Sequence, residues 1–319
     1  MKVAFGNVDI NSFSGPNSFA RRLAESLNNQ GIPVVSPADQ YDILLAFIEW
    51  NYYVRPEAKL VQRLDGIWFN TGMNWKRANE TISETYKKSD GVIFQSEFNK
   101  KLTEKYFGKC ESDNIVIHNG CSKLDDRAGS LQNAKSLRMM IDSIGGKMFV
   151  CASNWRPHKR LKEILKFFQK VAGKCDRLVV VGRPNNVDDV VADERIIWLG
   201  DSEQDMYLSI CSVADYMVHL AWLDHCPNVV VEALSVGCPV ICTDSGGTSE
   251  LVEGRGIVFP DKEWDFEPHD LYDPPELNLD ECARMFEEKS VELPIDNNDL
   301  DIEFVAKKYV DFFKTVLEA

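Results

Sequence analysis

Two acidic residues separated by seven positions stand beside a predicted helix start. Asp224 lies in a loop, Pro227 opens an apolar segment that is predicted to be helical to about residue 236, and Glu232 falls inside that segment. The first N–H groups of a helix have no intrahelical acceptor and therefore suit an anion. A carboxylate inside the same helix is placed to accept both hydroxyls of a ribose. The pattern predicts a site for a phosphorylated, hydroxyl-bearing ligand.

A basic segment lies upstream of these acids. Residues 147–183 hold ten basic and two acidic side chains, although the chain of 319 residues carries a net charge of −14. Arg156 and Lys159 stand where a predicted strand at 147–152 gives way to a helix predicted at about 159–173. A guanidinium and an ammonium at such a turn suit phosphate oxygens. An anion site is predicted here, and a solvated helix face is the alternative.

The composition excludes several classes of protein. Hydrophobic residues make up 44% and charged residues 27%, as in ordinary globular proteins. The acidic balance, which reaches −12 over residues 261–319, argues against nucleic acid as a partner. No apolar run is long enough to span a bilayer, and the first residues do not resemble a secretory signal. The nine cysteines form no CxxC pair and the five histidines no metal-ligand spacing, which predicts a cytoplasmic protein with reduced thiols and no metal.

Short apolar segments alternate with helical patterns, which predicts α/β domains with parallel sheets. We expect one domain over 1–122, a linker with an irregular helix over 123–146, and a second domain over 147–300. The predicted strands are 2–6, 34–35, 43–48, 59–64, 91–95, 115–118, 147–152, 177–181, 196–199, 216–219, 239–243 and 256–259. Ligands of such sheets bind beyond the carboxyl ends of the strands, and the candidate residues follow predicted strands.

The motifs resemble those of family 4 glycosyltransferases, which have the GT-B fold. The resemblance rests on the Asp224–Glu232 spacing, on the strand entry that follows at 233–241 and on the Gly-Gly turn with its acid at 245–250. It extends more loosely to both ends of the chain. It implies two Rossmann-like domains facing a cleft, with a C-terminal helix over 301–319 that crosses back to the N-terminal domain. The first acid is Asp where the family usually has Glu, which is longer by about 1.5 Å.

The resemblance also implies roles for individual residues. A nucleotide-sugar donor would lie on the second domain, with Lys159 and Arg156 at its diphosphate, Glu232 at its ribose and Asp224 at its sugar. The other residues that the resemblance places near the donor are Gly15, which follows the first strand, Gly182, Arg183, Leu199, Gly200, Pro227, Asn228 and Val229.

The N-terminal domain gives weaker signals for an acceptor. Asp65 follows a predicted strand at a point where many relatives have a His. A contact with an acceptor or sugar hydroxyl and a turn-forming Asp-Gly pair are equally open interpretations of Asp65. The aromatic side chains of this region are able to stack on a sugar, although packing is the more common use of such rings. They are Trp50, Tyr52, Tyr53, Trp68 and Trp75.

The function implied by the resemblance is a retaining glycosyltransferase. It would move a sugar, expected to be a hexose, from a UDP- or GDP-sugar to a hydroxyl of a glycan, glycolipid or glycoprotein acceptor, without a metal cofactor. The departing phosphate itself would take the acceptor proton. The alternative is a nucleotide-sugar-binding module or subunit without transfer activity. A nicotinamide dehydrogenase is disfavoured, because no GxGxxG follows a strand. At most peripheral membrane contact is expected, and the oligomeric state is open.

Overall fold

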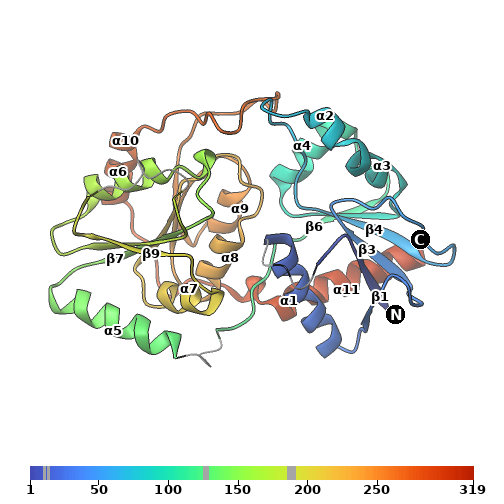
Figure 1. Cartoon of the computed structure of the whole chain (residues 1–319), viewed down its shortest axis with the longest axis horizontal. Helices are drawn as coiled ribbons and strands as arrows, with labels where there is room; N and C mark the ends of the chain where they lie inside the picture. Colours follow the sequence, from blue (N-terminus) through green and yellow to red (C-terminus); the bar gives the residue numbers. More distant parts are fainter. Residues whose placement is uncertain (10–11, 13–14, 125–128, 185–191) are drawn as a thin grey trace. The chain divides into compact units, whose positions relative to one another are not determined.

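The computed structural model of the chain consists of two compact units, each built on a six-stranded parallel sheet (Figure 1). The structure describes residues 1–9, 12, 15–124, 129–184 and 192–319. The N-terminal unit comprises Met1–Ser122, Asp265–His269 and Asn298–Ala319, and the C-terminal unit comprises Lys123–Trp264 and Asp270–Asn297. The predicted α/β class with two parallel sheets is therefore confirmed.

The sheet of the N-terminal unit has the strand order β2-β1-β3-β4-β5-β6. Its strands are β1 (Val3–Gly6), β2 (Val34–Val35), β3 (Ile43–Phe47), β4 (Lys59–Leu64), β5 (Gly91–Phe94) and β6 (Asp113–Val116). Its helices are α1 (Gly15–Asn29), α2 (Trp75–Ala78), α3 (Glu80–Lys88), α4 (Glu97–Phe107) and α11 (Ile302–Glu318). The central strands β1, β3 and β5 are buried along their whole length, as expected where helices cover both faces of a parallel sheet.

Helix α11 is part of the N-terminal unit although it comes last in the sequence. Asp301 caps its start by accepting a hydrogen bond from the Glu303 backbone N–H at 2.9 Å. Tyr309 and Phe313 are completely buried, together with Phe19 of α1, in the core of this unit. Figure 1 shows α11 running beside α1 under the sheet. The C-terminal helix that the resemblance implied for residues 301–319 thus packs in the N-terminal unit.

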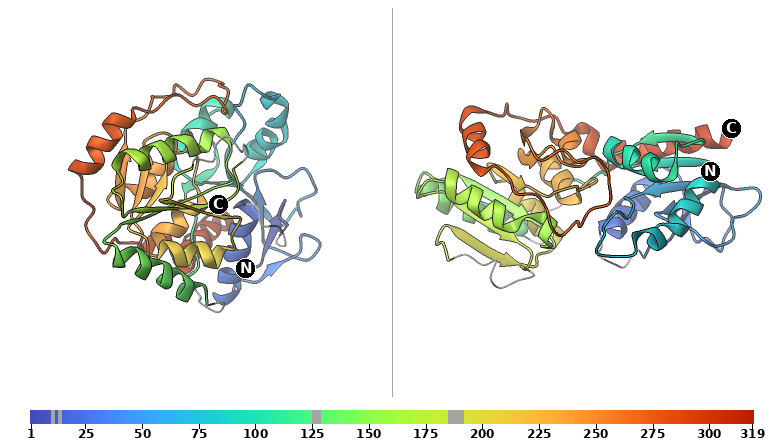
Figure 2. Two further views of the ribbon diagram at one scale, coloured as in Figure 1. Left: turned by 60° about the vertical axis from the view of Figure 1, so that its left-hand side comes forward. Right: turned by 90° about the horizontal axis from the view of Figure 1, so that it is seen from above.

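The sheet of the C-terminal unit has the strand order β12-β11-β10-β7-β8-β9. Its strands are β7 (Met148–Ala152), β8 (Arg177–Val181), β9 (Ile196–Gly200), β10 (Tyr216–His219), β11 (Val240–Thr243) and β12 (Gly256–Phe259). Its helices are α5 (Ser130–Ser143), α6 (Leu161–Val171), α7 (Gln204–Cys211), α8 (Asn228–Ser235), α9 (Thr248–Val252) and α10 (Leu279–Glu288), with a 3₁₀ turn η1 (Pro157–Lys159). Figures 1 and 2 show α6 and α10 side by side on one face of this sheet, where their apolar residues share a core with Phe149.

Two segments differ from the sequence-based expectation. The predicted linker contains a regular helix, α5, which packs against α7 and is tied to the C-terminal unit by an ion pair between Arg138 and Asp215. Helices α2 and α3 were not predicted: α2 has only four residues, and Ile82 and Tyr86 are the only large apolar side chains on the buried face of α3. Among the described residues, no helix is long and apolar enough to cross a membrane.

Candidate functional site

Three loops of the C-terminal unit meet at the carboxyl edge of its sheet. The loop after β7 carries Lys159 at the end of η1, the loop after β10 carries Asp224, and the loop after β11 carries Gly246. The strands are parallel neighbours in the order β11-β10-β7, so the three loops emerge side by side. Residues that are 87 positions apart in the sequence, from Lys159 to Gly246, therefore form one constellation.

Asp224 is held by two donors on a single carboxylate oxygen. Its Oδ2 accepts a hydrogen bond from the Lys159 ammonium and lies 3.1 Å from Nε2 of His219. The side chains are only 16%, 18% and 4% exposed for Asp224, Lys159 and His219. Burial alone would raise the pKa of Asp224, but the charge of Lys159 and the His219 hydrogen bond outweigh it and hold that pKa well below its usual value. Asp224 is therefore ionised at neutral pH.

The turn after β11 fixes the loop that carries Asp224. The Gly247 N–H donates to the Asp224 carbonyl oxygen at 2.7 Å, and the Leu223 N–H donates to the Ser245 hydroxyl at 3.1 Å. Gly246 has a φ of +78°, and a Cβ at this position would stand 2.4 Å from the Asp224 carbonyl oxygen. Glycine is required here both for the left-handed backbone and for the close approach of the two loops.

We expect Gly246→Ala to displace Asp224. The substitution should lower the free energy of unfolding by about 1–2 kcal/mol for the left-handed backbone and by a further 1–3 kcal/mol for the clash. Gly254→Ala is a matched control, because Gly254 has nearly the same φ, +75°, but nothing lies within 4 Å of its added Cβ. Urea unfolding of both variants measures the difference. Equal losses would mean that the close approach to Asp224 does not constrain the loop.

Glu232 is buried in the second turn of α8. Gln204, at the start of α7, donates a hydrogen bond from Nε2 to Glu232 Oε1 at 2.7 Å. The Tyr207 hydroxyl donates to the Val229 carbonyl at 2.8 Å and pins the first turn of α8 to α7. The carboxylate is thus fixed in direction by α7 while it remains at the same edge of the sheet as Asp224.

The start of α8 presents backbone donors. Pro227 caps the helix without a side-chain hydrogen bond, and Asn228 and Val229 form the first turn. The Val230 N–H already returns to the Pro227 carbonyl at 3.0 Å, whereas the Val229 N–H has no intrahelical acceptor. This geometry suits an anion beside the helix start, as the sequence predicted.

A buried ion pair anchors the loop that carries Lys159. Arg160 adopts a left-handed φ of 54° and turns its side chain inward, where it makes bidentate contacts of 2.6 and 3.2 Å with Asp261. Both side chains are completely buried. Arg160 also donates to the Pro275 carbonyl at 2.6 Å. The pair joins the end of η1, next to Lys159, to the segment after β12.

The basic segment at 147–183 is therefore not a single anion site. Arg160 is neutralised by Asp261, Lys170 pairs with Asp280 at 2.5 Å on the surface, and Arg177 donates to backbone carbonyls. Arg156 caps η1, is exposed and makes no ion pair with any residue that the structure describes. Arg156 and Lys159, the two cations that the sequence analysis placed at the predicted anion site, remain its candidates within this segment.

The loops after β8 and β9 contain the remaining predicted donor residues. Gly182 has a φ of +92°, and an added Cβ would stand 2.0 Å from the Ser153 carbonyl oxygen; its N–H donates to the Gly200 carbonyl at 2.7 Å. Arg183 is exposed and pairs with Asp201 at 2.9 Å. Leu199 is 41% exposed at the end of an edge strand. Gly182 thus packs against the loop after β7, whereas Arg183 and Leu199 lie on the surface near the β9 edge of the C-terminal sheet.

Asp65 in the N-terminal unit is the counter-ion of a buried arginine. Arg63, the penultimate residue of β4, is completely buried and pairs with Asp65 Oδ1, which also accepts from the Gln95 amide. The same guanidinium donates to the Tyr309 hydroxyl at 3.0 Å and to Asn119 Oδ1 at 2.5 Å. Asp65 Oδ2 is buried and accepts no hydrogen bond from the described residues. The structure thus adds to the two sequence-based interpretations a third role, charge compensation.

Gly15 begins helix α1. The loop that the sequence analysis singled out before it includes Phe13 and Ser14, which lie outside the described residues. Gly15 and Asp65 belong to the N-terminal unit, and the other predicted site residues belong to the C-terminal unit.

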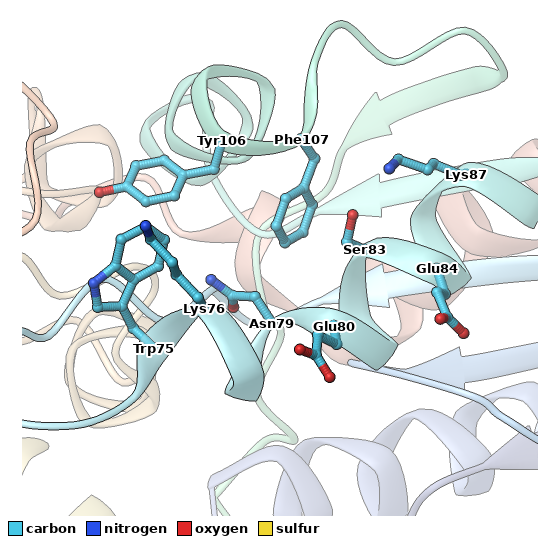
Figure 3. Close-up of a pocket in the computed structure, with 9 residues that line it drawn as sticks. All are labelled: Trp75, Lys76, Asn79, Glu80, Ser83, Glu84, Lys87, Tyr106 and Phe107. Carbon is cyan, nitrogen blue, oxygen red and sulfur yellow. The ribbon is translucent and has the colours of Figure 1, made fainter.

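An open groove of about 450 Å³ lies between helices of the N-terminal unit (Figure 3). Trp75 and Tyr106 form one wall, with ring centroids 5.3 Å apart, and Phe107 stands opposite Ser83. The predicted aromatic residue Trp75 therefore lines a groove. Tyr52 and Tyr53 are instead 72% and 73% exposed.

Two histidines, His158 and His225, are the sequence neighbours of Lys159 and Asp224. Burial lowers the pKa of His158 to about 3 and that of His225 to about 4, so both rings are neutral at neutral pH. Within the described ranges, no group of three or more His, Cys, Asp or Glu side chains is arranged to hold a metal ion. All nine cysteines lie in these ranges and are free thiols.

Three residues of this arrangement were not assigned from the sequence. His219, Arg160 and Asp261 contact or anchor the predicted site residues. A polar residue at the carboxyl end of an apolar strand was the available signal for His219. The Arg160–Asp261 pair gave no signal, because its members are 101 positions apart.

Part of the C-terminal unit is similar in sequence to known proteins. Residues 146–267 match the family model described as glycosyl transferases group 1. The chain is 27% identical over 253 residues to N-acetyl-alpha-D-glucosaminyl L-malate synthase from Bacillus anthracis. That match covers 75% of this chain and 56% of the relative, so the chain spans little more than half of the relative's length.

Solved structures share the fold over nearly the whole chain. HepE from Anabaena, in complex with UDP and glucose, has a TM-score of 0.67 at 16% identity, covering 99% of this chain and 100% of that chain. Sucrose-phosphate synthase from Thermosynechococcus elongatus has a TM-score of 0.62 at 13% identity, covering 99% and 95%. The resemblance inferred from the motifs is confirmed for residues 146–267, which match the model of glycosyl transferases group 1, and the chain shares its fold with these solved structures.

Proposed function

We propose that this chain is a retaining glycosyltransferase that uses a UDP-sugar as its donor. The observation that carries the proposal is the convergence of Lys159, Asp224 and Glu232 on one edge of the C-terminal sheet, in the segment that matches the family. The HepE structures, which are described as complexes with UDP, with UDP and glucose, and with UDP-glucose, support uridine as the base. A GDP-sugar is the alternative donor that the sequence left open.

The proposal gives these side chains distinct contacts with the donor. Glu232, aimed by Gln204, accepts the ribose hydroxyls. Lys159, Arg156 and the first backbone N–H groups of α8 stabilise the negative charge that develops on the departing diphosphate, which is often the largest contribution to catalysis. Asp224 accepts a hydroxyl of the donor sugar. These cationic groups take the place that a divalent metal has in other transferases, so we expect turnover to persist in EDTA.

The proposed transfer step needs no protein side chain as a base. The acceptor oxygen attacks the anomeric carbon from the face that the phosphate leaves, and the bond from that carbon to the phosphate oxygen breaks. The acceptor proton passes to the departing phosphate oxygen, and the products are the glycoside and the nucleoside diphosphate. The acceptor is proposed to be a hydroxyl of a carbohydrate or a lipid-linked carbohydrate.

Thermal unfolding with UDP, GDP and their sugars tests the donor. A ligand at 100 times its Kd should raise the free energy of unfolding by about 2.7 kcal/mol. We expect stabilisation by UDP and UDP-sugars and a much smaller shift with the GDP series. Stabilisation by the GDP series alone would show that the donor base is guanine and not uracil, and no stabilisation by either series would refute the donor site.

Glu232→Gln should lower UDP affinity about 10- to 100-fold, because a hydrogen bond to a charged group contributes about 1.5–3 kcal/mol. The amide oxygen of the substituted side chain keeps the bond from Gln204, so the fold should be retained. Glu253→Gln, which makes the same charge change at an exposed position after α9, is the control. Calorimetric titration with UDP measures both variants, and equal affinities would exclude Glu232 from the ribose contact.

A nucleotide-sugar-binding subunit without transfer activity is the second candidate. It is favoured by the engagement of Asp65 with Arg63 and Gln95, which leaves fewer polar atoms of the N-terminal unit for an acceptor. Incubation with UDP-glucose distinguishes the two: an enzyme releases UDP slowly by hydrolysis, whereas the subunit binds the sugar nucleotide and returns it intact.

A further inference from the structure

A buried histidine stands behind the candidate donor site with no role assigned to it so far. His219 is the last residue of β10, between Val218 and Leu220, both of which are buried, and it pairs in register with Cys242 of β11. Its side chain is 4% exposed. An apolar residue would continue the pattern of this strand, so the imidazole is the unusual choice at this position.

The single polar contact of the ring that the structure describes is with Asp224. Because Asp224 is ionised, its Oδ2 is able only to accept, and the imidazole must present Nε2–H to it. Burial lowers the pKa of His219, and the charge of Lys159 acts in the same direction against the effect of Asp224. The charged and titratable groups facing the ring are Lys159, Asp224 and the neutral His158. The ring is therefore a neutral donor with one fixed tautomer.

The two donors leave the carboxylate with one engaged and one available oxygen. Both His219 Nε2 and Lys159 Nζ reach Oδ2, and no residue in the described ranges donates to Oδ1. Two donors on one oxygen fix the rotation of the carboxylate about its last bond. An aspartate carboxylate lies about 1.5 Å nearer to its backbone than a glutamate carboxylate would, so its direction decides whether it reaches a ligand.

We propose that His219 is a positioning residue of the donor site. With Lys159 it fixes the carboxylate of Asp224, so that Oδ1 accepts a hydrogen bond from a hydroxyl of the donor sugar. This inference rests on the proposed function. It assigns to His219 an effect on the sugar alone, because the diphosphate and ribose contacts belong to Lys159, Arg156 and Glu232.

The test compares His219→Leu, which removes the donor at similar volume, with His219→Gln, whose amide N–H lies near the position of Nε2. His269→Leu, at an exposed position in the N-terminal unit, is the control for loss of a histidine. The measurements are UDP binding by calorimetry and kcat and KM for UDP-glucose hydrolysis. We expect His219→Leu to lower kcat about 10- to 100-fold, since misplacement of a reacting group costs up to about a hundredfold. Its Kd for UDP should stay within about threefold, and His219→Gln should restore most of kcat.

Each outcome separates the inference from the function it rests on. A wild-type protein that neither binds UDP nor hydrolyses UDP-glucose would refute the proposed function, and the inference with it. An active wild type with an unchanged kcat in His219→Leu would refute the inference alone. Parallel losses of kcat and UDP affinity in both variants would also overturn it, because they would show that His219 only maintains the packing of β10.

Discussion

Lys159→Ala should lower kcat/KM for a UDP-sugar about 10²- to 10³-fold. That is the loss typical of removing one preorganised donor from the place where negative charge develops. Lys159 is the cation that the fold brings to the loop of Asp224, and its side chain is only 18% exposed, so its charge is less screened than that of a surface lysine. The measurement is steady-state turnover of UDP-glucose, together with UDP affinity.

Lys170→Ala is the matched control for this prediction. It removes the same charge from α6, where Lys170 pairs with Asp280 at the surface with exposures of 41% and 88%. We expect kcat/KM to stay within about twofold of the wild type. Lys159→Arg should keep part of the activity, because the charge remains while the point donor becomes a planar fork. Near-normal turnover in Lys159→Ala would remove this lysine from the proposed mechanism.

Asp261→Ala should destabilise the C-terminal unit by about 3–5 kcal/mol. Breaking a buried ion pair leaves a charge without its partner in a site that water does not reach. Arg160 and Asp261 are both completely buried, and the guanidinium also spans the Pro275 and Leu220 carbonyls, so it has no route to solvent. Urea unfolding followed by a probe of the C-terminal unit gives the loss.

Two further variants separate charge burial from packing. The double variant Arg160→Met/Asp261→Leu should recover much of the stability, because no buried charge remains unpaired. Asp280→Ala removes an acid from an exposed pair and should cost at most about 1 kcal/mol. If Asp261→Ala behaved like Asp280→Ala, the anchor described for the Lys159 loop would not exist.

Much of the C-terminal site was predictable from local sequence. The strand at 216–219, the helix that begins near Pro227 and the Gly-Gly turn each carry their signal within a few residues, and their order in a parallel sheet brings the loops to one edge. Gly246 shows why the turn needs glycine: the requirement is a contact with Asp224, which is 22 positions away. Local pattern marks such a residue without revealing its partner.

The rest depended on pairings between distant residues. Arg160 looked like one more cation of a basic segment until the structure paired it with Asp261. Asp65 looked like either a turn residue or a ligand contact, since nothing near it in the sequence shows that Arg63 is inward and buried. Burial of a charge is decided by tertiary packing, and residue type and spacing do not report it.

The N-terminal unit combines residues from both ends of the sequence, which constrains when it can fold during protein synthesis. A ribosome releases residues 1–122 long before α11, yet the core around Phe19 includes Tyr309 and Phe313 of that helix. Until α11 is synthesised, the apolar face that this helix covers therefore stays exposed on the nascent N-terminal segment, while the C-terminal unit is synthesised and folds. This reverses the usual N-terminal-first sequence of domain folding and makes the growing chain a natural client for chaperones.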